Sequence, residues 1–180
     1  MKKYFFIVLL SVCAIQAKSQ RERTNEVKLN IFNTLTISSA EVGYERYLDD
    51  HQSMGLKMVF NDRFSYYAPF SSKKKFNTTS IALNYTYYLG DADNNRGSGF
   101  SITPFVKGRF GNYKEEKSTG TEKTNMDSFI LGIGGGYKWV LGNAFTIQPF
   151  FNIGRNFSET VNDKFMSLEP NAGVDIGYRF

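Results

Sequence analysis

The sequence predicts an all-β protein, an eight-stranded antiparallel up-and-down transmembrane β-barrel. Eight segments alternate between apolar and polar residues with the period of two that is typical of strands. Aromatic residues form 16% of the 180-residue chain and are spread along it, together with 16 glycines and four prolines. Beyond the first twenty residues, no apolar run is long enough for a transmembrane helix. These observations predict that amphipathic strands cross the bilayer.

The N-terminal segment has the three parts of a secretory signal. Two lysines are followed by the apolar run 4–10 and then by small and polar residues. We expect cleavage after Ser19, so that residues 1–19 are a signal peptide and residues 20–180 form an outer-membrane β-barrel domain. The chain's one cysteine, Cys13, lies in the signal segment. The mature domain is therefore expected to have no disulfide and no cysteine-ligated metal.

The charge of the mature domain is small. The formal net charge of the whole chain is +5, and three of its lysines lie in the signal segment, which leaves +2. So small a positive excess predicts no nucleic-acid partner.

We expect the first three strands at residues 27–37, 41–48 and 53–61. Large apolar residues occupy alternate positions in each, with polar residues or glycine between them. These apolar positions are Val27, Leu29, Ile31, Leu35, Ile37, Val42, Tyr44, Leu48, Met54, Leu56, Met58 and Phe60.

Four further segments continue the alternation, and two of them contain a proline at an equivalent position. Proline cannot donate a hydrogen bond to a strand ladder, so we expect a bulge or weak pairing at Pro104 and Pro149. The four strands are expected at 79–90, 99–113, 127–141 and 144–157.

The eighth strand is expected at residues 171–180. One face carries an apolar series that ends on an aromatic residue, and the other carries both signs of charge and no large hydrophobic residue. The apolar series is Ala172, Val174, Ile176, Tyr178 and Phe180. Such a strand suits a position between lipid and a polar lumen, and it brings the count to the even number of bacterial single-chain barrels.

Loop lengths give an independent check on this strand assignment. Membrane barrels have short periplasmic turns and longer external loops. If the first strand rises from the periplasm, three of the four external loops are longer than every periplasmic turn. The external loops are then 38–40, 62–78, 114–126 and 158–167, and the periplasmic turns are 49–52, 91–98 and 142–143.

Charged residues on the polar faces predict an ion network inside the barrel. Eight strands enclose an interior that side chains can fill, and unpaired buried ions cost several kcal/mol each. We therefore expect Glu45 and Asp175 to pair with Lys107, Arg109, Lys138 and Arg179. A filled polar core is favoured over an ion pathway by the number of strands. The predicted network consists of Glu45, Lys57, Lys107, Arg109, Lys138, Asp175 and Arg179.

The external loop after the third strand combines aromatic residues with a basic cluster. Lysine ammonium groups bind phosphate as point charges, so this loop could hold anionic lipopolysaccharide or a partner surface. A solvated loop tip is the alternative. The candidate contact residues are Tyr66, Tyr67, Lys73, Lys74 and Lys75.

Candidate catalytic and metal-binding residues are few. The one histidine, His51, falls in a periplasmic turn, which is the wrong side for the external chemistry of enzymatic outer-membrane barrels. Asp91, Asp93 and Asn95 have the spacing of calcium ligands, but their glycine is one place late and Ile102 stands where a bidentate glutamate is needed. We therefore expect no catalytic residue, no metal and no cofactor.

The chain resembles the small eight-stranded outer-membrane β-barrel proteins of Gram-negative bacteria, the class that includes OmpA- and OmpX-type barrels. The segments that carry the resemblance are 27–31, 41–47 and Val174 to Phe180. It implies location in the cell outer membrane, contact with its lipids and lipopolysaccharide, and a monomer. It also implies that Ile176, Tyr178 and Phe180 form the signal that the barrel-assembly machinery reads.

Three functions remain open at this point. The first is a non-enzymatic structural, surface-interaction or envelope-stability role in the outer membrane. The second is a narrow channel for small solutes, which needs a continuous wet path between the inward charges. The third is a soluble lipocalin-like barrel with an apolar ligand, which needs the opposite arrangement of apolar and polar faces.

Overall fold

The computed structural model describes residues 23–63, 74–90, 96–117, 120–142 and 144–180. The expected signal peptide lies outside these residues. So do Tyr66, Tyr67 and Lys73 of the external loop and the calcium candidates Asp91, Asp93 and Asn95.

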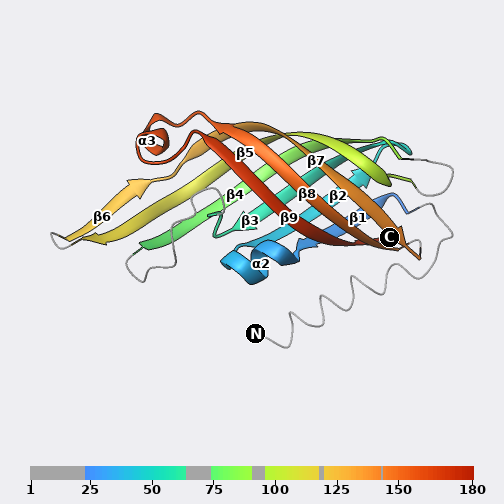
Figure 1. The fold of residues 1–180 in the computed structure, drawn as a ribbon, viewed down its shortest axis with the longest axis horizontal. Coiled ribbons are helices and arrows are strands. Elements are labelled where there is room, and N and C mark those ends of the chain that lie inside the picture. Colours follow the sequence, from blue (N-terminus) through green and yellow to red (C-terminus); the bar gives the residue numbers. More distant parts are fainter. Residues whose placement is uncertain (1–22, 64–73, 91–95, 118–119, 143) are drawn as a thin grey trace.

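Eight antiparallel strands form a closed barrel (Figure 1). Each pairs with the next around the sheet, β4 pairs with β5, and β9 returns to pair with β1. The predicted fold class is therefore confirmed. The barrel strands are β1 Asn25–Asn30, β2 Ala40–Tyr47, β3 Gln52–Phe60, β4 Lys74–Tyr88, β5 Gly99–Lys117, β7 Ser128–Leu141, β8 Phe145–Asn156 and β9 Leu168–Arg179.

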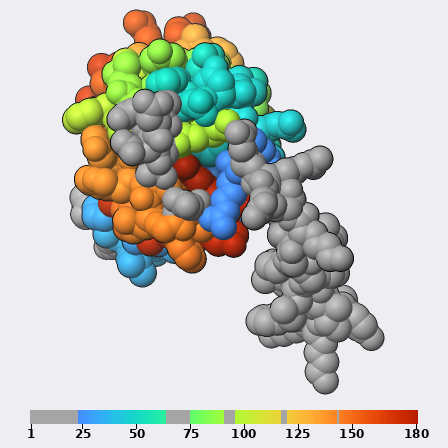
Figure 2. Space-filling view, turned by 90° about the vertical axis from the view of Figure 1, so that its right-hand side faces the viewer, coloured from blue at the N-terminus to red at the C-terminus, as the bar shows by residue number. Residues whose placement is uncertain are grey.

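The first and last strands of the described chain meet at one end of the barrel. Backbone hydrogen bonds join Asn25 to Phe180 in both directions, at 3.2 and 2.9 Å. Seen from this end, the blue β1 segment lies beside the red β9 segment, and the orange, green and cyan strands continue around the rim (Figure 2). We call this the termini end and the opposite one the distal end.

The first strand is shorter than predicted. The segment 27–37 was expected to be one strand, but β1 ends at Asn30 and a helix, α2 Ile31–Ile37, follows it. The Asn30 side chain accepts a hydrogen bond from the Asn33 backbone N–H at 3.0 Å, which is a helix N-cap. Local capping therefore overrides the alternation of apolar residues over 31–37.

A small sheet projects beyond the barrel at the distal end. The segment 114–126 was predicted to be a loop. It instead contains the distal part of β5 and a further strand, β6 Gly120–Asn125, which pairs with β5 (Figure 1). A helical turn, α3 Glu159–Asn162, lies beside this extension. One face of this small sheet packs against α3 and the residues after it. The contact is a hydrophobic cluster of Tyr113, Met126 and Val161 with Phe76 and Phe165.

The two prolines interrupt pairing without shifting the register. The β4–β5 ladder skips two pairs, Tyr85–Pro104 and the next one, and the β7–β8 ladder skips two pairs, Tyr137–Pro149 and the next one. The registers on either side are unchanged, so both sites are weak pairings and not bulges.

The two faces of the barrel differ sharply in chemistry. Outside, large apolar side chains are exposed on every barrel strand; inside, charged and polar side chains are buried. Among the outward residues are Val27, Leu29, Tyr44, Leu56, Met58, Leu83, Tyr85, Ile102, Val106, Leu131, Ile133, Trp139, Phe151, Ile153, Ile176 and Tyr178. No helix of the described segments is both long enough and apolar enough to cross a bilayer.

Candidate functional site

The candidate site is the charged interior of the barrel. The residues that form ion pairs there include equal numbers of carboxylates and cations, so their formal charges cancel. The carboxylates are Glu26, Glu41, Glu45, Asp62, Glu169 and Asp175, and the cations are Lys28, Lys57, Lys107, Arg109, Lys138 and Arg179.

The first group of these residues is a cluster at the termini end, which we call the termini cluster: Glu26, Glu45, Lys28, Lys138 and Arg179, with Tyr47 and Tyr88. Lys138 Nζ lies 3.3 Å from Glu26 Oε2 and 2.9 Å from Glu45 Oε2. Arg179 Nε donates to Glu26 Oε2 at 3.0 Å, and Lys28 pairs with Glu45. Three cations therefore share two buried carboxylates, and of the cations only Lys28 is partly exposed, at 12% of its side chain.

Two tyrosines complete the termini cluster. The Tyr47 hydroxyl donates to Glu26 and accepts from Lys138 Nζ at 2.8 Å and from Arg179 Nη2 at 2.7 Å. The Tyr88 hydroxyl donates to Glu45 Oε1 at 2.5 Å. Lys138 Nζ lies 5.2 and 4.8 Å from the ring centres of Tyr47 and Tyr88, within the range of cation–π attraction. The rings thus stabilise the surplus positive charge.

The second group is the distal cluster, Asp62, Lys107, Arg109 and Glu169. Arg109 is fully buried and donates to both Glu169 oxygens, from Nη1 at 2.8 Å and from Nη2 at 2.7 Å. Its Nε donates to Asp62 Oδ2 at 3.0 Å. Lys107 Nζ lies 3.1 Å from Asp62 and 3.3 Å from Glu169. Two carboxylates and two cations therefore form a neutral group around a bidentate arginine.

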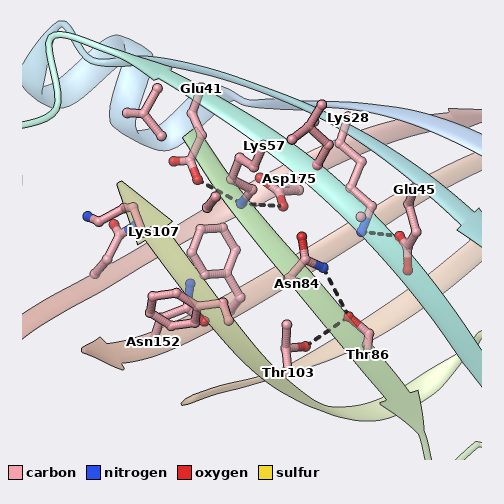
Figure 3. Close-up of a pocket in the computed structure, with 18 of the residues that line it drawn as sticks. Lys28, Glu41, Glu45, Lys57, Asn84, Thr86, Thr103, Lys107, Asn152 and Asp175 are labelled. Carbon is pink, nitrogen blue, oxygen red and sulfur yellow. Dashed lines mark hydrogen bonds and ion pairs between the residues drawn. The ribbon is translucent and has the colours of Figure 1, made fainter. Parts of the chain in front are cut away.

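A cavity of about 90 Å³ lies between the two clusters. Lys57 lines this cavity, and its Nζ lies 2.7 Å from Glu41 Oε1 and 3.4 Å from Asp175 Oδ2 (Figure 3). The other Asp175 oxygen, Oδ1, is buried and has no hydrogen-bond partner among the described residues. A cavity of this volume with polar walls can hold several waters.

The middle of the lumen is also shaped by glycines on β7. A Cβ at Gly132 would lie 2.3 Å from Cζ of Phe105, and one at Gly136 would lie 3.3 Å from Cβ of Phe150. The missing side chain at Gly132 therefore leaves room for the inward ring of Phe105, whereas at Gly136 the nearest atom is the Pro149 backbone oxygen, at 2.7 Å.

The predicted network residues all lie inside, but part of the predicted pairing is wrong. Glu45 contacts Lys138, as expected. Asp175 pairs with Lys57 and not with the four cations that were expected to share it, because β9 places it beside the middle of the lumen. Lys107, Arg109 and Arg179 instead pair with carboxylates that the sequence analysis left out.

Four carboxylates were missed: Glu26, Glu41, Asp62 and Glu169. Glu26 lies just before the expected first strand, Asp62 in an expected external loop, and Glu169 just before the expected eighth strand. One signal could have found them. The predicted interior held six cations, counting Lys28, against two carboxylates, and a filled lumen cannot keep such an excess unpaired.

The remaining predicted positions lie at the ends of the barrel. Lys74 and Lys75 begin β4 at the distal end. Ile176 and Tyr178 face outward on β9, and Phe180 follows its last residue. His51 lies in the β2–β3 turn at the termini end, where its ring stacks with Tyr87 at 6.3 Å.

The comparisons with known proteins agree with this architecture. The model of a family described as "Protein of unknown function (DUF3575)" matches residues 4–178. No curated protein matches the chain. Among solved structures, the N-terminal β-barrel domain of Pseudomonas aeruginosa OprF is similar, with a TM-score of 0.53 and 14% identity, covering 89% of this chain and 100% of that domain.

Two other solved structures align more loosely. Neisserial surface protein A (NspA) gives a TM-score of 0.46, and Ail, the attachment invasion locus protein of Yersinia pestis, gives 0.47. Each is 10% identical, covering 87% of this chain and 93% of its own. The likeness in fold rests on the OprF domain.

Proposed function

The chain belongs to the DUF3575 family of proteins of unknown function, and we propose that it is an integral outer-membrane barrel with a non-enzymatic structural or surface-interaction role in the envelope. In this proposal residues 1–19 direct export and are removed, and residues 20–180 form the membrane domain. The outward Ile176 and Tyr178, with Phe180, present the final strand to the barrel-assembly machinery.

A single observation carries this proposal: apolar side chains face outward on all eight strands while the charges are paired inside. In water, so large a contiguous apolar surface would drive aggregation. In a bilayer the same surface is solvated by acyl chains, and the closed ladder leaves no unpaired strand edge along the barrel. The arrangement is therefore the one that a lipid environment stabilises.

The other two functions fit this arrangement less well. A soluble lipocalin-like barrel needs an apolar interior, and the described interior holds six carboxylates and six cations. A solute channel needs a continuous wet path, whereas the fully buried Arg109 and Lys138 belong to the two ion-pair clusters between which the central cavity lies.

The location can be tested by cell fractionation together with electrophoresis of unheated samples. A folded membrane barrel is expected in the outer-membrane fraction, as a compact species whose migration changes on boiling. N-terminal sequencing of that species tests cleavage after Ser19. A water-soluble protein without a heat-dependent change in migration would contradict the proposal.

A pair of substitutions tests which medium solvates the outer face. Leu83 is 57% exposed and pairs with Leu56 at the middle of the β3–β4 ladder. Leu83→Arg is expected to lower the stability of the vesicle-inserted barrel by about 2–4 kcal/mol, the cost of arginine at the bilayer midplane. The matched control is Leu48→Arg, just beyond β2, where the expected cost is about 0–1 kcal/mol. Equal tolerance at both positions would indicate water around the barrel.

A further inference from the structure

The sheet that projects from the distal end carries three lysines in one row. In the β4–β5 pairing Lys75 lies directly opposite Lys114, and in the β5–β6 pairing Lys114 lies directly opposite Lys123. Directly opposed residues have Cβ atoms about 4.5–5.5 Å apart, and like charges in such positions repel. We call these three residues the lysine row.

The described part of the chain does not neutralise the lysine row. All three side chains are exposed, and no ion pair among the described residues involves any of them. A surface hollow of about 270 Å³ lies beside the row, lined by Lys75, Lys114, Glu116 and Thr121. Glu116 offsets one of the positive charges at most. The row therefore keeps a local positive excess that an external anion would relieve.

The row faces away from the barrel axis. Phe76 and Tyr113, which occupy the intervening positions, point the other way and pack against Phe165 in the hydrophobic cluster. Because side chains alternate along a strand, Lys75 and Lys114 lie on the same side of the sheet as the outward apolar residues nearer the termini end of β4 and β5.

Going outward along these strands, polarity increases in steps of two residues, each about 7 Å. Phe110, opposite Thr79, is 58% exposed and is the last large apolar residue on the outer face of β5. The next row consists of three opposed amides, Asn77, Asn112 and Asn125. The lysine row follows, about 13 Å along the strand from Phe110. Hydrocarbon, uncharged polar groups and anions succeed one another in this order at a membrane surface.

We propose that the lysine row binds the phosphate groups of anionic lipids in the surrounding leaflet, of which lipopolysaccharide is the outer-membrane form. The inference rests on the proposed membrane location with the distal end outside. Ammonium groups bind phosphate as point charges, and three of them in line can hold more than one phosphate. The repulsion within the row makes its stability depend on that anion.

The test uses the mature chain in nanodiscs of phosphatidylcholine, with and without added lipopolysaccharide. Thermal unfolding is followed by the heat-dependent change in migration. Lipopolysaccharide is expected to raise the Tm of the wild type by several degrees. Most of this increase should be absent in a Lys75→Gln/Lys114→Gln/Lys123→Gln variant. In pure phosphatidylcholine the variant should melt no lower than the wild type, because it lacks the repulsion. In a direct titration, each lysine should contribute roughly fivefold to the affinity.

Two control variants separate the row from charge in general. Arg46→Gln removes one exposed cation at the termini end and should keep the full effect of lipopolysaccharide. Lys114→Glu places a carboxylate between two lysines, so it should raise the Tm in phosphatidylcholine and abolish the effect of lipopolysaccharide.

The outcomes distinguish this inference from the membrane assignment. A chain that inserts into phosphatidylcholine but responds to lipopolysaccharide equally with and without the row overturns the lysine row as a site. An equal response to inorganic phosphate at the same concentration overturns lipid as its source. A chain that does not insert into phosphatidylcholine at all overturns the proposed location, and the lipid ligand with it.

Discussion

The two ends of the lumen solve the problem of buried charge in different ways. In the distal cluster, a bidentate arginine and a lysine neutralise two carboxylates, and the group carries no net charge. In the termini cluster, three cations share Glu26 and Glu45, and two tyrosines supply hydroxyls and ring faces. The formal charges of the distal cluster cancel, whereas the positive excess of the termini cluster depends on each carboxylate and on the two tyrosines for its stabilisation.

This difference predicts unequal sensitivity to loss of a single group. Removing one partner from a buried ion pair leaves an uncompensated charge, and the cost grows with the number of ions that shared that partner. Glu26 forms ion pairs with Lys138, Arg179 and, at 4.0 Å, Lys28, and it accepts from the Tyr47 hydroxyl and, at 2.7 Å, from the Thr146 hydroxyl. The termini cluster should therefore be the weaker point of the barrel.

The largest effect is expected from Glu26→Gln. The substitution keeps the shape of the side chain but leaves Lys28, Lys138 and Arg179 with Glu45 as their carboxylate. We expect the free energy of unfolding to fall by about 3–5 kcal/mol. It can be measured by urea unfolding in lipid vesicles, followed by the fluorescence of Trp139, the single tryptophan.

The double variant Glu26→Gln/Arg179→Gln provides the control, because it removes one charge of each sign and should recover part of the loss. A loss below about 1 kcal/mol in Glu26→Gln, in the range of an exposed pair, would mean that the tyrosines and water stabilise the three cations without it.

A smaller effect is expected from Arg109→Lys in the distal cluster. Lysine keeps the charge, but it lacks the planar guanidinium that lets Arg109 donate to both Glu169 oxygens and to Asp62 at once. Since Lys107 stays within 3.3 Å of both carboxylates, the loss should be about 1.5–3 kcal/mol, the value of charge-assisted hydrogen bonds. The same urea titration measures it.

Lys107→Gln serves as the matched variant, and its effect should be smaller still, because Arg109 retains its bonds to both carboxylates. If Arg109→Lys destabilises the barrel more than Glu26→Gln does, the ranking of the two clusters is reversed.

The strand pattern predicted the barrel well because each barrel strand has an apolar outer face and a polar inner face. Eight alternating segments were recognised, and their observed bounds differ by few residues over 41–61 and 127–157. The pattern failed where this difference between the faces ends. Strand β6, Gly120–Asn125, has no large apolar residue, since both of its faces lie beyond the apolar belt, so alternation could not mark it.

The charge network was predicted less completely for a related reason. Inward cations such as Lys107 and Arg109 lie in mid-strand and were found by alternation. Several of their partners lie at or beyond strand ends: Asp62 follows β3, and Glu169 is the second residue of β9. Which strand ends face each other depends on the register, which alternation alone does not give.

The middle of the lumen offers a comparison that involves no charge. A Cβ at Gly132 would lie 2.3 Å from Phe105 Cζ and 2.5 Å from the Ile153 backbone oxygen. Gly132→Ala should therefore cost about 1–3 kcal/mol, as overpacking does. Gly135→Ala, three residues along the same strand, would meet only the Ser101 oxygen at 3.5 Å and should be close to neutral. Equal stability of the two variants, measured by thermal unfolding in vesicles, would mean that the lumen is not packed there.

The smallest effect is expected from an ion pair outside the barrel, between Lys164 and Glu122, whose side chains are 39% and 37% exposed. Water already solvates both charges, so Lys164→Gln should change the free energy of unfolding by about 0–1 kcal/mol, with a weaker effect at high salt. The pair has the same charges as those inside the lumen and differs from them in burial. A loss equal to that of Arg109→Lys would mean that pairing itself, and not the buried setting, determines the sensitivity of the two clusters.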